Sequence, residues 1–254
     1  MHLGVCHHVT LPGEWDRAIA DAGALGFEGI ELFVRSNTMA DLLDRPERVA
    51  SLRAAADRAG ISFPSLGLVF FGPNFRLYEL DLDARANAVQ QVRVGIERCA
   101  ELGGRVVLVP GAPPLNDKPA VEAYVGSLKD LATTAARLGV RIGIETSYDS
   151  PETREILGRV GSPWVGDYFD TGNAAGQGRD PVAEIRQRKG LIVQIHVKGT
   201  RGADLAAGTV DLPAVKRALQ ETGYDDWLML ETSAGDAPLD AARRNYAVLR
   251  ESLL

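Results

Sequence analysis

Cysteine is scarce in this chain, which has Cys6 and Cys99 alone among its 254 residues. Two cysteines exclude a disulfide framework and favour a reducing compartment. The sequence also lacks a long apolar run, since none approaches the roughly 20 residues of a membrane-spanning helix. Its first residues, MHLGVCHH, lack the basic segment and following apolar stretch that mark a signal peptide. We therefore expect a cytoplasmic protein with no membrane partner.

Positive charge and histidine are also in short supply. Lysine and arginine total 28 against 34 aspartates and glutamates, the net charge is −6, and there are four histidines. Because nucleic-acid phosphates are bound by a basic surface, this balance argues against a nucleic-acid partner. The remaining composition, with 45% hydrophobic and 24% charged residues, is that of an ordinary globular protein.

One unit repeats along the chain: a short apolar strand, an amphipathic helix, and a glycine near the helix end. Glycine suits the left-handed residue that ends many helices, and Gly26, Gly139 and Gly223 are examples. Proline after Ser150 and after Asp180 marks two helix starts. The predicted strands are residues 3–7, 28–33, 62–69, 105–110, 140–145, 164–170, 191–197 and 227–231. The predicted helices are residues 14–25, 46–59, 81–102, 119–138, 151–160, 181–189, 211–222 and 238–252.

Eight strand–helix units predict an α/β fold. Strands that alternate with helices form a parallel sheet with right-handed crossovers, and about 250 residues is the usual size of a (β/α)8 barrel. An open doubly wound sheet is the alternative, but it would usually place a glycine-rich phosphate turn after the first strand. Residues 7–12 read HHVTLP and do not form that turn. We therefore predict a single (β/α)8 barrel, or TIM barrel, over residues 1–254.

Four consecutive predicted strands end on side chains that bind metal ions, namely Glu145, Asp170, His196 and Glu231. The carboxyl ends of barrel strands meet at one mouth, so these side chains should lie together. Three carboxylates and an imidazole suit a divalent cation such as Mn²⁺, Mg²⁺, Co²⁺ or Zn²⁺. Structural zinc would favour cysteines. The alternative interpretation is that polar residues follow these strands by chance. On the sixth strand the periodicity favours Asp170 as the ligand, because Asp167, three residues earlier, should face the opposite side.

Such a site suits proton transfer beside a carbonyl. A divalent ion polarises a carbonyl and stabilises the negative charge of an enediolate. Glu145 and Glu231 would face each other across the ion, so one can remove a proton from the carbon next to the carbonyl and the other can return one. The substrate would be a hydroxy-ketone or hydroxy-aldehyde, and no organic cofactor is needed.

Five segments resemble the sugar (phosphate) isomerase/epimerase superfamily, whose members have a xylose-isomerase-like TIM barrel. They are residues 26–32 (GFEGIEL), 144–145 (IE), 169–173 (FDTGN), 195–198 (IHVK) and 230–232 (LET). The resemblance runs nearly end to end. It implies one divalent metal ion held by Glu145, Asp170, His196 and Glu231, with Glu145 and Glu231 also acting as the acid/base pair. A homodimer is suggested by the resemblance alone.

The chain departs from this superfamily at positions around the expected site. Many members carry histidine three residues after the aspartate, where this chain has Asn173. The 3-epimerases commonly carry arginine six residues after the histidine, where this chain has Gly202. Several members have aspartate after the lysine, where this chain has Gly199. The metal and proton machinery is thus matched, while the contacts to substrate are altered.

Four further side chains are candidate substrate contacts: His7, Glu31, Asn173 and Lys198. Lys198 lies two residues after His196 and so on the same strand face, where it would meet a substrate oxygen or phosphate. Glu31 would hydrogen-bond a substrate hydroxyl or another residue of the mouth. His7 is preferred to its neighbour as the side chain of strand one that faces the mouth, and Asn173 lies near the site by position. Each has a purely structural alternative.

Two loops are predicted to lie at the barrel mouth. Residues 70–78, FFGPNFRLY, are predicted to form an aromatic lid that excludes water, or else to pack on the rim. Residues 172–178, GNAAGQG, lack the lysine of a P-loop and the spacing of a dinucleotide loop, so they are predicted to be a flexible loop of the mouth.

These observations favour a metal-dependent isomerase or epimerase of a small keto-sugar or related polyol ketone. An inosose-dehydratase-like enzyme would share the first proton abstraction and then lose a β-hydroxyl. An endonuclease IV-like nuclease would need several histidines at a multi-zinc site, and only His196 lies in the half of the chain that supplies the ligands. A non-catalytic barrel is the fourth alternative, against which the four retained ligands argue.

Overall fold

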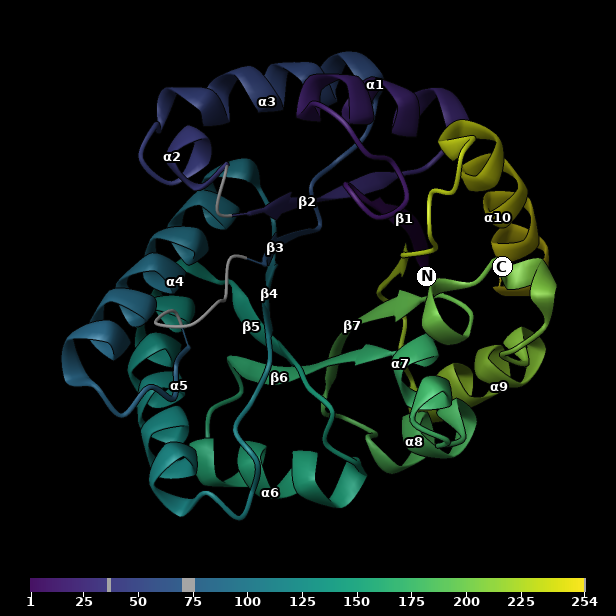
Figure 1. The fold of residues 1–254 in the computed structure, drawn as a ribbon. Helices are drawn as coiled ribbons and strands as arrows, with labels where there is room; N and C mark the ends of the chain where they lie inside the picture. Colours follow the sequence, from purple (N-terminus) through teal and green to yellow (C-terminus); the bar gives the residue numbers. More distant parts are fainter. Residues whose placement is uncertain (36–37, 70–75, 254) are drawn as a thin grey trace.

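Eight parallel strands close into a barrel in the computed structural model, which describes residues 1–35, 38–69 and 76–253 (Figure 1). Each strand pairs with the next in the chain, and the last pairs with the first, so that Gly4 lies opposite Met229. The strands are β1 (His2–Cys6), β2 (Gly29–Val34), β3 (Ser65–Leu68), β4 (Val106–Pro110), β5 (Arg141–Glu145), β6 (Val165–Asp170), β7 (Ile192–Val197) and β8 (Trp227–Leu230). The predicted barrel is confirmed.

A ring of helices surrounds the strands (Figure 1). The predicted helices correspond to α1 (Trp15–Leu25), α3 (Glu47–Ala59), α4 (Leu82–Leu102), α5 (Lys118–Leu138), α6 (Ser150–Val160), α8 (Pro181–Gln187), α9 (Leu212–Thr222) and α10 (Pro238–Leu253). Four short elements were not predicted: α2 (Met39–Leu42), α7 (Thr171–Gly176), η1 (Thr200–Gly202) and η2 (Leu205–Ala207).

The prediction of a flexible loop at residues 172–178 is wrong over most of its length, because α7 occupies residues 171–176. Its first turn is stabilised by the Asp170 side chain, which accepts a hydrogen bond from the backbone N–H of Asn173. Helix α7 therefore begins directly on a residue of the expected metal site. The predicted aromatic lid lies mostly outside the described residues, since these resume at Arg76.

Local sequence signals explain where the longer helices begin and end. Helix α6 opens with a capping box, in which the Asp149 carboxylate accepts from the Glu152 N–H and the Glu152 carboxylate accepts from the Asp149 N–H. The cap lies one residue before the predicted Ser150. Gly139 ends α5 with a left-handed φ of 69°, which glycine adopts without steric cost.

The main hydrophobic core lies between the barrel and its helices, and two smaller clusters fill the barrel interior. The interior positions alternate between large side chains and glycine. A Cβ on Gly67 would stand 2.5 Å from the Phe33 ring, and a Cβ on Gly4 would stand 2.4 Å from the Met229 sulfur. These glycines leave room for bulky side chains inside the barrel. Among the described residues, no helix has the length and apolar character needed to cross a membrane.

Candidate metal centre

The four predicted ligands lie together at the carboxyl ends of the strands. Glu145 ends β5, Asp170 ends β6, His196 lies on β7, and Glu231 directly follows β8. Each offers one ligand atom, and these atoms all lie within 4.8 Å of one another. His196 Nδ1 is 3.9 Å from Glu145 Oε1, 4.0 Å from Asp170 Oδ2 and 3.3 Å from Glu231 Oε2. The barrel thus gathers into one cluster four residues that are spread along the chain from Glu145 to Glu231.

Two of the predicted substrate contacts adjoin this cluster. Lys198 Nζ lies 2.7 Å from Asp170 Oδ2 and also donates to Glu231 Oε2, so its ammonium bridges two of the carboxylates. Asn173 Nδ2 donates to Glu145 Oε1 at 2.8 Å. Lys198 arrives from β7 and Asn173 from α7, so both approach from the side of β6 and β7.

Burial and charge act in opposite directions on the carboxylates. Burial raises the pKa of Asp170 to about 7, even though Lys198 favours the ionised form. Burial would also raise the pKa of Glu231, but His196 and Lys198 outweigh it and hold that pKa at about 2. Burial and the two positive side chains thus shift the pKa values of these neighbouring carboxylates in opposite directions.

The donor set fits a divalent cation. His196 Nδ1 is buried and has no hydrogen-bond partner among the described residues, although three carboxylates surround it. An unpaired buried nitrogen costs free energy unless a ligand satisfies it. Mixed carboxylate and imidazole ligands suit Mn²⁺, Mg²⁺, Co²⁺ or Zn²⁺. Glu145, Asp170, His196 and Glu231 are the residues that would hold the ion.

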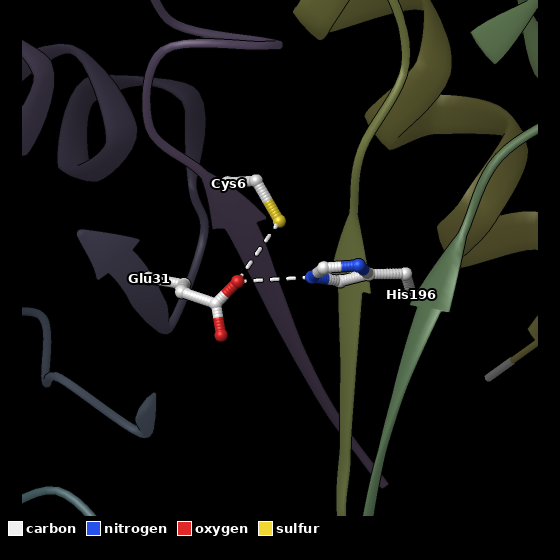
Figure 2. A group of neighbouring side chains, drawn as sticks. All are labelled: Cys6, Glu31 and His196. Atoms are coloured by element: carbon white, nitrogen blue, oxygen red, sulfur yellow. Dashed lines mark hydrogen bonds and ion pairs between the residues drawn. The ribbon is translucent and has the colours of Figure 1, made fainter. Parts of the chain in front are cut away.

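Glu31 lies below this cluster rather than in the open mouth. Its side chain is fully buried, and its Oε1 accepts from His196 Nε2 at 2.9 Å (Figure 2). Cys6 Sγ lies 3.6 Å from the same oxygen. Since the protein's own groups surround this carboxylate, the structure does not support the expected contact with a substrate hydroxyl. The alternative expectation is a hydrogen bond between Glu31 and another residue of the mouth, and the contact with His196 agrees with it.

His7 lies beside a separate cavity of about 290 Å³ at the carboxyl ends of β1 and β2. Its Nε2 hydrogen-bonds the carbonyl of Gly13 at 2.8 Å, and its ring is buried. Phe33 and Arg35 line the same cavity, and the Phe33 ring centroid is 6.3 Å from that of His196. Phe33 therefore lines this cavity and also lies near the predicted ligand His196.

Residues 19–252 match the family model of the xylose isomerase-like TIM barrel. The chain belongs to that family. Among curated members, it is 27% identical over 259 residues to the L-ribulose-5-phosphate 3-epimerase UlaE of Salmonella paratyphi A, covering 94% of this chain and 90% of that protein. It is 28% identical over 242 residues to the rhizopine catabolism protein MocC of Rhizobium meliloti, covering 80% of this chain and 71% of that protein.

Solved structures agree with this family fold. The chain superposes on D-psicose 3-epimerase, determined in the presence of D-fructose, with a TM-score of 0.86 at 18% identity, covering 100% of this chain and 99% of that one. The 3-keto-D-glucoside 4-epimerase YcjR of E. coli gives a TM-score of 0.84 at 18% identity and 99% coverage of both chains. At this identity, the likeness establishes the shared barrel.

Three buried polar residues below the family barrel's mouth were not predicted: Ser65, Tyr168 and Gln194. Strand periodicity could have found two of them, because Tyr168 lies two residues before Asp170 and Gln194 lies two residues before His196. Each therefore points into the barrel one layer below a ligand. Ser65 gave no such signal, since its strand supplies none of the four ligands.

Proposed function

We propose that this protein is a divalent-metal-dependent epimerase or isomerase of a small keto-sugar or related polyol ketone. The observation that supports it is the cluster of four ligand atoms within 4.8 Å of one another, which includes two glutamates, one at the end of β5 and one directly after β8. The similarity to proteins named as ketose epimerases points to the same chemistry. A bound divalent cation would supply positive charge to the substrate's carbonyl and hydroxyl oxygens, which would acidify the C–H of the hydroxyl-bearing carbon next to the carbonyl.

The two glutamates carry the proton steps of this proposal. One carboxylate removes the proton from the carbon beside the ketone, and the C–H electron pair moves into a carbon–carbon double bond to form an enediolate. The other glutamate enters the step as the neutral carboxylic acid and gives its proton to the opposite face of that carbon. The double-bond electron pair forms the new C–H bond, the carbonyl re-forms, and the configuration is inverted. The positions of Glu145 at the end of β5 and of Glu231 directly after β8 support these roles, as does the 2.8 Å hydrogen bond from Asn173 to Glu145.

Lys198 and His7 are proposed as substrate contacts on either side of the cluster. The Lys198 side chain is 12% exposed and its ammonium already lies between two carboxylates, so a substrate hydroxyl bound there would meet a fixed positive charge. His7, Phe33 and Arg35 line the 290 Å³ cavity at the carboxyl ends of β1 and β2. In this proposal the cavity binds the end of the sugar remote from the ketone.

Solvent deuterium exchange tests this function. The protein is incubated with Mn²⁺ in D2O and a panel of ketoses, keto-inositols and their phosphates, and products are followed by NMR. We expect deuterium at the carbon beside the ketone together with the epimeric or isomeric sugar. The Glu145→Gln and Glu231→Gln variants should each lose at least about a thousandfold in rate, because each removes one proton carrier.

A matched control is Glu152→Gln, which changes a carboxylate of the α6 capping box outside the ligand cluster. Its exchange rate should match that of the unchanged protein. Release of water with formation of an unsaturated ketone would instead identify a dehydratase. Absence of exchange with every member of the panel would contradict the proposal.

A further inference from the structure

The barrel interior contains a carboxylate whose two oxygens are both saturated with hydrogen-bond donors. Glu31 Oε1 faces His196 Nε2 at 2.9 Å and Cys6 Sγ at 3.6 Å (Figure 2). Glu31 Oε2 accepts from Ser65 Oγ at 2.5 Å and from Tyr168 OH at 2.8 Å. All of these groups are buried. A charged carboxylate at this depth persists only where donors surround it, and here four do.

Gln194 determines the direction of these hydrogen bonds. Its Nε2 donates to Ser65 Oγ at 2.6 Å and to Tyr168 OH at 2.9 Å, which uses both amide protons. Each hydroxyl accepts from Gln194 and so has its single proton free to donate to Glu31. The opposite orientation of the amide would draw both hydroxyl protons away from Glu31. The network therefore makes Glu31 an acceptor in all of its contacts.

An acceptor at Glu31 has a direct consequence for His196. Its Nε2 must carry a proton in order to hydrogen-bond Glu31 Oε1 at 2.9 Å. A histidine that binds a metal ion is neutral and has one N–H, so Nδ1 then presents a lone pair. That Nδ1 is the atom that faces Glu145, Asp170 and Glu231 at 3.3 to 4.0 Å. A metal ion binds the unprotonated nitrogen of histidine, and the hydrogen bond of the other nitrogen selects which one that is.

We propose that Glu31, saturated by Ser65, Tyr168, Cys6 and His196, is a positioning residue that holds His196 with its Nδ1 lone pair directed at the metal centre. This inference rests on the metal centre of the proposed function. It replaces substrate binding as the role of Glu31. Cys6, Glu31 and His196 also lie close enough together to bind a single cation. A cation there would require His196 Nε2 to lose the proton that it donates to Glu31.

Replacement of Glu31 by glutamine tests the inference, since an amide cannot accept on both sides. With its amide nitrogen toward His196, glutamine still accepts from both hydroxyls, but Nε2 must then accept and Nδ1 carries the proton. We expect E31Q to bind Mn²⁺ alone, in a calorimetric titration without substrate, 10- to 100-fold more weakly, the range typical for loss of a partner of a metal-bound histidine.

Tyr168→Phe is the matched control. It removes one hydrogen bond to the same carboxylate and one from Gln194, but it leaves the bond between Glu31 and His196 in place. Thermal unfolding should therefore show that Y168F is destabilised, while its Mn²⁺ affinity stays close to that of the unchanged protein. If affinity merely followed stability, the two variants would weaken binding in parallel, and the inference would be overturned.

NMR of the unchanged protein can locate the proton on the His196 ring directly, so this test does not depend on the folding of a variant. With Zn²⁺ bound and histidine labelled with ¹⁵N, His196 should show a slowly exchanging Nε2–H proton, distinguishable among four histidines. A proton on Nδ1 instead, or equal Mn²⁺ affinity in E31Q, overturns the inference while the proposed function stands. Failure of the unchanged protein to bind Mn²⁺ or Zn²⁺ overturns both.

Discussion

At the scale of single residues, Asn173 connects two of the predicted ligands through hydrogen bonds. Its backbone N–H donates to Asp170 Oδ1 and its side-chain amide donates to Glu145 Oε1, each at 2.8 Å. One residue of α7 thus fixes the orientation of two predicted ligands on neighbouring strands.

Asn173→Ala should lower kcat for deuterium exchange about 10- to 100-fold, because Glu145 loses the donor that aims it and small misplacements of a reacting group have effects of that size. KM should change little. Steady-state kinetics on the best substrate of the panel measures both. The variant N173D keeps the shape of the side chain but offers no amide proton, so it should lose as much. A wild-type kcat in N173D would contradict this account of Asn173.

At the scale of elements, a buried charge cluster ties β6 to α8 and to the loop before α6. Arg188 Nη1 donates to Asp167 Oδ1 at 2.9 Å, while its Nε and Nη2 donate to Glu184 Oε2 at 3.2 and 2.7 Å. Its Nη2 also donates to the carbonyl of Tyr148 at 2.7 Å. Asp167 faces away from Asp170, as the strand periodicity predicted. This cluster fixes the outside of the strand whose end carries a predicted ligand.

The guanidinium is shared unequally between its two carboxylates. Glu184 takes two of the donors and also lies 3.8 Å from Arg179, whereas Asp167 Oδ2 has no partner among the described residues. Burial therefore raises the pKa of Asp167 to about 6, against the opposing effect of Arg188. The folded state prefers a protonated Asp167 at a pH where the unfolded chain, with a pKa near 3.9, has already released the proton.

This difference predicts how stability changes with pH. Because the folded state binds more protons between pH 4 and pH 6, the free energy of unfolding should fall as pH rises through that window, by on the order of 1–3 kcal/mol. Asp167→Asn mimics the protonated side chain and should remove this part of the slope. Urea unfolding at several pH values measures it, with the exposed Asp130→Asn as control. Equal slopes in D167N and the unchanged protein would refute the assignment.

The elements also show why some features followed from the sequence and others did not. Strand and helix limits agree within about three residues because glycine, proline and aspartate mark them, as Gly139 does for α5. Helix α7 was missed because it is only six residues long, two of them are glycine, and its first turn depends on a cap from Asp170. The four ligands could be predicted because each of them lies at the end of a different strand. Glu31 could be located, but not its bond to His196, which spans 165 positions of the chain.

At the scale of the whole molecule, the polar side chains cross the barrel and connect strands that do not pair with each other. Glu31 of β2 meets His196 of β7 and Tyr168 of β6, while Gln194 of β7 meets Ser65 of β3. The four ligands above this layer come from β5 to β8. A cation bound there would therefore link the four strands β5 to β8. This link would add to the hydrogen bonds that already cross the barrel interior.

Metal binding should consequently stabilise the folded barrel as a whole. Because the four ligands are brought together only by folding, a cation at about 100 times its Kd should add about 2.7 kcal/mol, or roughly 5–10 °C in Tm for a domain of this size. Thermal scans with Mn²⁺ and with a chelator measure the shift, and elemental analysis should find about one divalent ion per chain. The double variant Glu145→Gln/Glu231→Gln should lose both the ion and the shift, because two of the four ligands lose their charge. An equal shift in the double variant would place the stabilising ion elsewhere, and so would remove the basis for assigning these four residues to one centre.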